Sequence, residues 1–502
     1  MKEEGILIEL IKLIVHKGLF FLLFSFLFFI GCSVLKKGII ESNQEQAIKF
    51  SKLINKRDLF NDLSVLASDS LEGRETAKPG QKKAAEYIKN HFISNRIKSP
   101  FDTSYYQQYR VNIIDFTNVS LTINNQPLKL IEDFFVIGSP ITTKHQNIEL
   151  IDIEYGIKNK KINNYSNKNV KGKVVLIKDG LPENKDDFLI SEGSWRNKAK
   201  LAKEQGAIAV LLIKQSFANE NKRIKEHILN PRMKMHNSKI NLKNEIPLFY
   251  ISEEFVNKLD SSKKKLVSFH TSVNNIALAE NVLGYIPGKN QEEVVVLSAH
   301  YDHIGFNQGE VCNGADDDGS GTAALLSISK AFQIAYEAGH KPERSVLFLS
   351  VSGEEKGLFG SKYYTENPVF QLNNTIANLN IDMVGRRDTI QPNDNYIYLI
   401  GSDKISKDLH LINEQINKRH IGFNLDYTYN KDSDPNKFYY RSDHYNFAKN
   451  NVPVIFYFGG LHEDYHKPTD QIDKINFSKL EKVSQFVFLT AWELANRKES
   501  LK

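Results

Sequence analysis

Residues 294–305 read VVVLSAHYDHIG and decide the fold. The run 294–297 is continuously apolar, as expected of a parallel strand that is buried on both faces of its sheet. His300, Asp302 and His303 follow directly. Because ligands bind at the carboxyl edge of open α/β sheets, this stretch predicts a sheet whose edge carries chemistry.

Strands and helices are expected to alternate through the rest of the C-terminal half. Apolar runs predict strands at 345–351, 376–381, 396–400 and 453–458. Amphipathic spacing predicts helices at 319–338 and 476–496. This alternation predicts an α/β fold, a three-layer sandwich with a mostly parallel central sheet.

Several predicted strands deliver a histidine or carboxylate at the carboxyl end. Glu354 and Glu355 follow the strand 345–351, Asp382 ends an apolar strand, and His466 follows the strand 453–458. Buried carboxylates without partners are costly, so their convergence indicates a cation between them. Imidazole and carboxylate donors without a thiolate suit zinc or cobalt.

Five motifs carry a resemblance to a known family. They are AHYDHIG at 299–305, NGADDDGSG at 313–321, SGEEKGLFGS at 352–361, NIDMVG at 380–385 and HKPTD at 466–470. In this order they resemble the co-catalytic di-zinc exopeptidases, which include bacterial leucyl-type aminopeptidases, glutamate carboxypeptidase II and the transferrin receptor. The resemblance covers about 279–496 and implies the zinc exopeptidase type of sandwich.

The resemblance implies two Zn²⁺ ions per chain, with Co²⁺ or Mn²⁺ as alternatives. Asp316 is expected to bridge both ions. His300 and Asp382 are expected to complete one site, and Glu355 and His466 the other.

The same resemblance assigns catalytic roles. Glu354 is the expected general base, which takes a proton from the metal-activated water. Asp302 is expected to orient the imidazole of His300. Tyr439 or Tyr440 is the expected donor to the oxyanion, with packing in the core as the alternative for each.

Neighbouring residues have simpler interpretations. Asp317 and Asp318 are expected to cap the following helix or to surround the ligands. His444 is expected to pack beside the site, and His462 is a nearby alternative to His466. Cys312 is expected to be a small buried residue.

The expected activity is that of a metal-dependent exopeptidase, an aminopeptidase that removes the N-terminal residue of peptides. Two alternatives stay within the fold: a carboxypeptidase or dipeptidase, and, with one zinc, a glutaminyl cyclase. A third is an inactive binding protein, which the presence of all ligands and the base disfavours.

Composition excludes other classes of function. The chain has 502 residues, 41% hydrophobic and 25% charged, with a formal net charge of +6. These are the proportions of a globular protein, and the small basic surplus predicts no nucleic-acid partner. Peptides are the expected partners, and the oligomeric state is left open.

The N-terminus predicts export. Residues 18–30 read GLFFLLFSFLFFI, about the length of a signal-peptide core, and end at Gly31-Cys32-Ser33. This pattern resembles the signal of bacterial lipoproteins, which implies lipidation of Cys32. We therefore expect a membrane-anchored protein on the periplasmic or cell-surface face, held by its lipid alone, with an uncleaved N-terminal anchor helix as the alternative.

The middle of the chain has a different residue pattern. Between 134 and 272, β-rich runs such as GKVVLI at 172–177 and AIAVLLIK at 207–214 flank a helix that begins near Arg196. This pattern resembles the protease-associated domain. The expected division is a signal peptide at 1–31, a tether at 32–46, the first part of the peptidase domain at 47–133, the inserted domain at 134–272 and the di-zinc peptidase domain at 273–502.

Overall fold

The computed structural model describes residues 40–501, except 102–103, 138–141, 184–189, 216–227, 229–230, 237–245, 261–262 and 273. The predicted signal sequence and Cys32 lie outside the described residues. Within the described part of the chain, no helix combines the length and apolar character needed to cross a membrane.

The chain forms two compact units. One comprises the residues up to Tyr109 together with Ala279 onward, and the second is Arg110–Leu278. The second unit begins well before residue 134, because β2 (Val119–Ile123) pairs along its length with β10 (Leu266–Thr271). The region just before 134 therefore belongs to the insert rather than to the peptidase unit.

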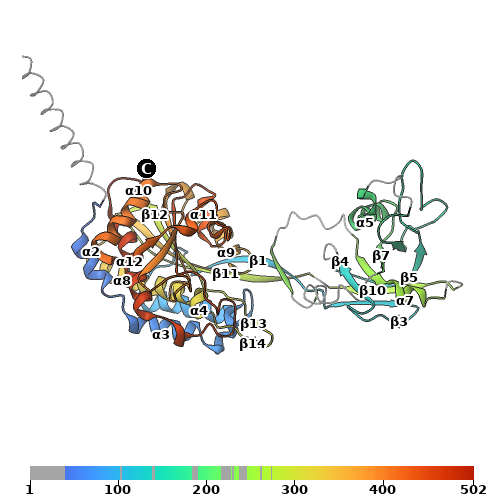
Figure 1. Ribbon diagram of the computed structural model, residues 1–502, viewed down its shortest axis with the longest axis horizontal. Helices are drawn as coiled ribbons and strands as arrows, with labels where there is room; N and C mark the ends of the chain where they lie inside the picture. The colour runs from blue at the N-terminus through green and yellow to red at the C-terminus, as the bar shows by residue number, and fades with distance from the viewer. Residues whose placement is uncertain are drawn as a thin grey trace, which may run out of the picture. The chain divides into compact units, whose positions relative to one another are not determined.

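A nine-stranded sheet in the order β18-β17-β19-β16-β12-β15-β11-β1-β8 runs through the centre of the first unit (Figure 1), and its last strand, β8, pairs with residues 111–114 of β1, which belong to the second unit. The four strands from β19 to β15 are parallel to one another, which confirms the predicted mostly parallel centre. The strands are β1 (Tyr106–Ile114), β8 (Arg232–Met235), β11 (Asn274–Ile286), β12 (Asn290–His300), β15 (Arg344–Val351), β16 (Thr375–Asp382), β17 (Tyr396–Ile400), β18 (Asn424–Asp426) and β19 (Val454–Phe458).

Helices of this unit cover the sheet. They are α2 (Gln44–Ser51), α3 (Lys56–Leu66), α4 (Pro79–Ser94), α8 (Gly321–Glu337), α9 (Phe359–Glu366), α10 (Lys407–Ile416), α11 (His444–Ala448) and α12 (Phe477–Asn496).

The alternation of side chains along β12 shows the three layers. Val295 and Leu297 join the core formed with α8 and α12, whereas Val294 and Val296 join a separate core with residues of α9 and α11. Successive side chains of a strand point to opposite faces, so both faces of the sheet are buried under helices. Burial on both faces of the sheet therefore explains why residues 294–297 are continuously apolar.

Residues 47–66 have helical apolar spacing, but the structure divides this stretch between α2 and α3. Asn55 interrupts it, because its side chain accepts a hydrogen bond from the backbone N–H of Asp58 at 3.1 Å and begins a new helix. Ile54, just before this cap, is buried in the main core. The turn thus directs an apolar residue inward between the two helices.

The second unit contains an eight-stranded sheet in the order β3-β2-β10-β5-β6-β7-β9-β4. Its helix α5 (Trp195–Glu204) carries the buried Lys198, whose ammonium donates to the carbonyls of Tyr155 and Lys178. The remaining strands are β3 (Gln126–Pro127), β4 (Phe134–Ile137), β5 (Thr143–Asp152), β6 (Val174–Lys178), β7 (Ala209–Lys214) and β9 (Leu248–Ser252).

Candidate metal centre

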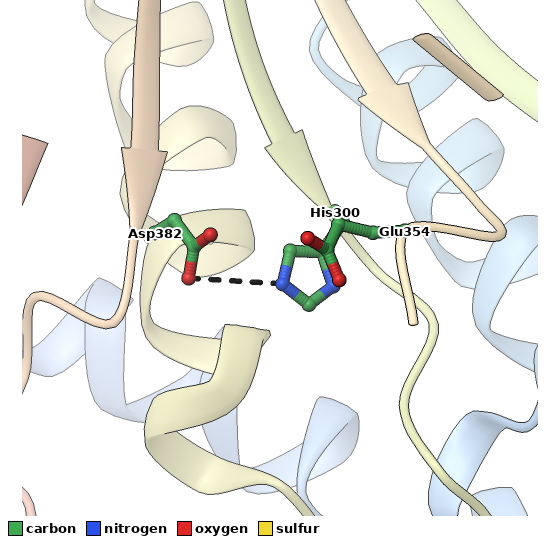
Figure 2. Close-up of side chains that lie close together, drawn as sticks. All are labelled: His300, Glu354 and Asp382. Atoms are coloured by element: carbon green, nitrogen blue, oxygen red, sulfur yellow. Dashed lines mark ion pairs between the residues drawn. The ribbon is translucent and has the colours of Figure 1, made fainter. Parts of the chain in front are cut away.

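The predicted site residues gather where the central parallel strands end. His300 is the last residue of β12, Asp382 is the last residue of β16, and Glu354 follows β15 by three residues. Figure 2 shows these three side chains facing one another, with His300 Nε2 at 3.7 Å from Asp382 Oδ1. Their donor atoms lie within 4.8 Å of one another, close enough to hold one cation.

Asp317 connects this group to a second one. Its Oδ1 lies 3.4 Å from His300 Nε2, and its Oδ2 lies 3.2 Å from His466 Nε2. Glu355 completes the second group, with Oε2 at 3.0 Å from the same nitrogen of His466. One carboxylate therefore lies between two histidines, as a ligand shared by two cations would.

Asp316, the residue expected in that position, points elsewhere. Its Oδ1 accepts a hydrogen bond from the backbone N–H of Gly385 at 2.6 Å, and its Oδ2 lies 3.3 Å from His462 Nε2. The local backbone conformation explains why Asp317, and not Asp316, faces the histidines. Asp317 is extended, with φ −102° and ψ 97°, and successive side chains of an extended backbone point to opposite sides.

Asp302 acts on a different partner from the one expected. The Nδ1 of His300 lies 3.1 Å from the backbone carbonyl oxygen of Asp302, and 3.8 Å from its carboxylate. That carboxylate instead accepts from the hydroxyl of Thr76 at 2.6 Å and from the backbone N–H of Glu354 at 3.2 Å. Asp302 thus fixes the loop that presents Glu354.

Two other carboxylates hold the backbone around the cluster. Asp470 accepts hydrogen bonds from the backbone N–H groups of Asp316 and Asp317, at 3.0 and 3.2 Å. Asp318 accepts from the N–H of Met383 at 3.0 Å and from the N–H of His300 at 3.2 Å. Asp318 and Asp470 therefore hold the backbone beside the cluster rather than face it.

A buried guanidinium ties the N-terminal segment to this loop. Arg74 is fully buried and donates from Nε to the carbonyl of Tyr301 at 2.7 Å. Its Nη atoms donate to the carbonyls of Leu66, Asn313, Gly314 and Asp317. Sequence reasoning missed this residue, because a lone arginine in LEGRET gives no sign of which carbonyls it meets.

Burial and neighbouring charges shift the pKa values of the cluster. Burial raises the pKa of Glu354 well above its usual value, and neighbouring carboxylates add to the rise. For Asp317, burial opposes ionisation, yet contacts with His300 and His466 hold the pKa well below normal. For Glu355, burial and Asp317 oppose ionisation, but His303 and His466 bring the pKa to about 2.

A small cavity opens onto the cluster. Tyr465, whose ring stacks on His466 at 3.9 Å between centroids, lines this cavity. The predicted oxyanion donors do not line it: Tyr440 is 50% exposed, and Tyr439 packs against His444. The cavity is lined by His300, Asp317, Glu354, Glu355, Asp382, Met383, Phe438, Arg441, Ser442, Phe456, Phe458, Leu461 and Tyr465.

The residues present fit a pair of cations. Asp317 Oδ2, Glu355 Oε1 and His466 Nε2 are buried and have no hydrogen bond within the described part of the chain. Buried polar atoms in folded proteins almost always have partners, so these atoms indicate partners other than protein groups, as bound cations would be. Imidazole and carboxylate donors are those of catalytic zinc sites.

An α/β sandwich with this donor set at its carboxyl edge has the fold of the zinc exopeptidases. Residues 281–491 match the model of Peptidase family M28, and residues 149–259 match that of the PA domain. The chain is therefore similar to family M28 peptidases over 281–491 and to the PA domain over 149–259. The predicted protease-associated domain is confirmed.

Curated relatives are similar to part of the chain. Aminopeptidase YwaD of Bacillus subtilis (strain 168) is 24% identical over 351 residues, which are 66% of this chain and 64% of the relative. A probable leucine aminopeptidase of Arthroderma benhamiae is 31% identical over 223 residues, 43% of this chain and 57% of the relative. The chain thus spans less than two thirds of the length of these curated relatives.

A solved structure has the same fold. The aminopeptidase from Aneurinibacillus sp. strain AM-1 matches with a TM-score of 0.50 and 19% identity, over 90% of this chain and 97% of that one.

The contacts of Arg74 generate a prediction about stability. Arg74→Met removes a donor from each of five carbonyls and should lower the free energy of unfolding by about 3 kcal/mol or more. Urea unfolding measures this loss. Hydrogen exchange should also become faster at the amides of residues 315–319, because the loop loses its anchor.

Arg344→Met is the matched control. Arg344 is also buried and donates to the carbonyls of Leu494 and Arg497, away from the cluster. Its loss should destabilise the protein without selective exchange at 315–319. Equal exchange behaviour in the two variants would contradict a special role for Arg74.

Proposed function

We propose that the protein is an aminopeptidase that uses two zinc ions to hydrolyse the N-terminal peptide bond of peptides. The observation that carries this proposal is the position of the Asp317 carboxylate, between His300 and His466. The family M28 domain and the aminopeptidases among the relatives support the same activity.

The ligands follow from the contacts. Asp317 would bridge the two ions in place of Asp316. His300 and Asp382 would complete the first site, where the hydroxyl of Ser442 donates to Asp382 at 2.6 Å and orients it. Glu355 and His466, which touch each other and Asp317, would belong to the second site.

Glu354 is the proposed general base. Zinc, when bound, supplies a water whose pKa falls to about 7 and a charge that polarises the substrate carbonyl. Glu354 lies beside His300 and Asp382, with its backbone held by Asp302, so its carboxylate is placed to take a proton from that water and return it to the leaving amine.

Tyr465 is the proposed donor to the oxyanion. It lines the cavity next to His466, and its ring is held by stacking on that imidazole. Burial raises the pKa of its hydroxyl, which keeps the group protonated and able to donate. This role replaces the one expected of Tyr439 or Tyr440.

The cavity wall supports an apolar N-terminal residue in the substrate. Besides the carboxylates it contains aromatic and aliphatic side chains, among them Phe438, Phe456, Phe458 and Leu461. An aliphatic or aromatic side chain gains free energy on leaving water for such a wall, whereas a charged one loses its hydration there.

Glu354→Gln tests the activity. The variant should keep the zinc content of the wild type, measured by elemental analysis, because the proposed ligands are intact. Its kcat on a chromogenic anilide of leucine should fall by about 100-fold or more. The same anilide with a blocked amine should resist the wild type. Full activity of the variant, or cleavage of the blocked substrate, would contradict the proposal.

Two neighbouring aspartates test the ligand assignment. Asp317→Asn should weaken the binding of both zinc ions by about 100-fold or more, because the shared ligand is lost. Asp316→Asn should change it by less than about 10-fold, since the Asp316 carboxylate contacts Gly385 and His462 rather than the proposed ligands. Competition with a chelator measures both. A larger loss of zinc affinity in Asp316→Asn than in Asp317→Asn would instead identify Asp316 as the shared ligand.

Arg441 favours a second candidate function, that of a dipeptidase or carboxypeptidase. Its side chain lines the cavity above the ring of Phe438, and no carboxylate of the described residues forms an ion pair with it. Arginine is well suited to bind a substrate carboxylate. The two functions differ in whether a free carboxyl terminus in the substrate is needed.

Leucylglycine and leucylglycinamide separate these functions. A dipeptidase should hydrolyse the free acid at least 10-fold faster, and Arg441→Gln should remove this preference. An aminopeptidase should accept both substrates similarly, with or without Arg441. Arg387→Gln is the control, because this exposed arginine does not line the cavity.

A further inference from the structure

His303 is a buried histidine with no assigned role. It lies three residues beyond the end of β12 and is fully buried. Neither of its ring nitrogens has a hydrogen bond within the part of the chain that the structure describes. A buried imidazole without a partner is unfavourable, so its position calls for a partner of another kind.

The Nδ1 atom of His303 faces the same carboxylates as His466. It lies 2.9 Å from Oε1 of Glu355 and 3.8 Å from Oδ2 of Asp317. The rings of His303 and His466 are 5.7 Å apart between centroids and inclined by 71°. Two imidazoles thus flank one pair of carboxylates.

The contact with Glu355 is short but is not a hydrogen bond. Nδ1 of His303 and Oε1 of Glu355 are 2.9 Å apart, yet both atoms lack a hydrogen bond. The in-plane direction of Nδ1, along which a proton or a lone pair lies, is therefore not aimed at this oxygen. Donor atoms that converge on a common ion have this arrangement, since each points at the ion and not at its neighbour.

The distances agree with a shared cation. Donors about 2.1 Å from a tetrahedral zinc ion lie about 3.4 Å from one another. The observed separations among His303, Asp317 and Glu355 are 2.9 and 3.8 Å, and their donor atoms all lie within 4.8 Å of one another.

The backbone fixes the ring of His303 in this place. Its N–H donates to the carbonyl of Arg74 at 3.2 Å. Gly314 lies against the ring, and a Cβ atom at that position would be 2.6 Å from two ring carbons. The absence of a side chain at Gly314, which has φ +53°, therefore makes room for the imidazole.

We propose that His303 is an additional ligand of the second cation, which would be held by His303, His466, Asp317 and Glu355. This inference rests on the proposed metal site but not on peptide hydrolysis. Four protein donors close a zinc site, whereas three leave a position open. The second site is thus the tighter, closed site, and the first site, with His300, Asp382 and Asp317, keeps the open position for substrate.

X-ray absorption of the full-length wild-type protein loaded with zinc tests this directly. The spectrum should show three imidazoles shared between two ions. Two imidazoles for two ions would overturn the proposal, and this measurement needs no variant to fold. A protein that shows three imidazoles but cleaves no peptide would support the ligand and refute the proposed function.

Metal binding by variants gives a second measurement. His303→Asn should lower the affinity for the more tightly bound zinc ion by more than about 100-fold. This exceeds the roughly 10–100-fold effect of residues that only orient ligands. It should also change the visible absorption of the protein loaded with Co²⁺.

His444→Asn is the matched control. His444 is also fully buried, but it stacks on Phe456 at 4.7 Å and forms no ion pair with a carboxylate of the described residues. It should bind two zinc ions as the wild type does. Unchanged zinc affinity and Co²⁺ absorption in His303→Asn would overturn the proposal.

Discussion

The convergence of negative charge at one edge of the central sheet is the constraint on which the rest of the structure depends. Asp317, Glu354, Glu355 and Asp382 line one small cavity, and each lies within a few ångströms of another acid. Two unit charges 4 Å apart repel by about 4 kcal/mol at an effective dielectric constant of 20. Such an arrangement requires positive partners, which His300, His466 and the proposed cations provide.

A layer of groups around the cluster keeps this arrangement in place. Asp302, Asp318 and Asp470 accept hydrogen bonds from backbone N–H groups, and Arg74 donates to backbone carbonyls. These contacts fix the loops rather than the ligand side chains themselves. The same layer explains why acids so close in sequence have different roles: one faces the cavity while its neighbours hold the main chain.

The sequence predicted the features that depend on residue type and strand ends. The apolar strands, the edge they share and the convergence of His300, Asp382, Glu355 and His466 followed from patterns that any buried parallel sheet imposes. It did not distinguish Asp316 from Asp317, because that choice depends on a backbone conformation that three identical residues do not reveal. Tyr465 was likewise hidden, because adjacency to His466 has meaning only once the cavity is known.

The reach of Arg74 has a consequence for how the chain folds. Its partner Tyr301 is 227 residues away in sequence, and the second unit accounts for most of the chain between them. Closing a loop of that length is entropically unfavourable, although the penalty grows only slowly with length. The strands β1 and β11 enter and leave the second unit as neighbours in one sheet. If that unit folds early, it brings these two strands together and shortens the effective loop. Folding of the insert would then lower the entropic cost of folding the first unit.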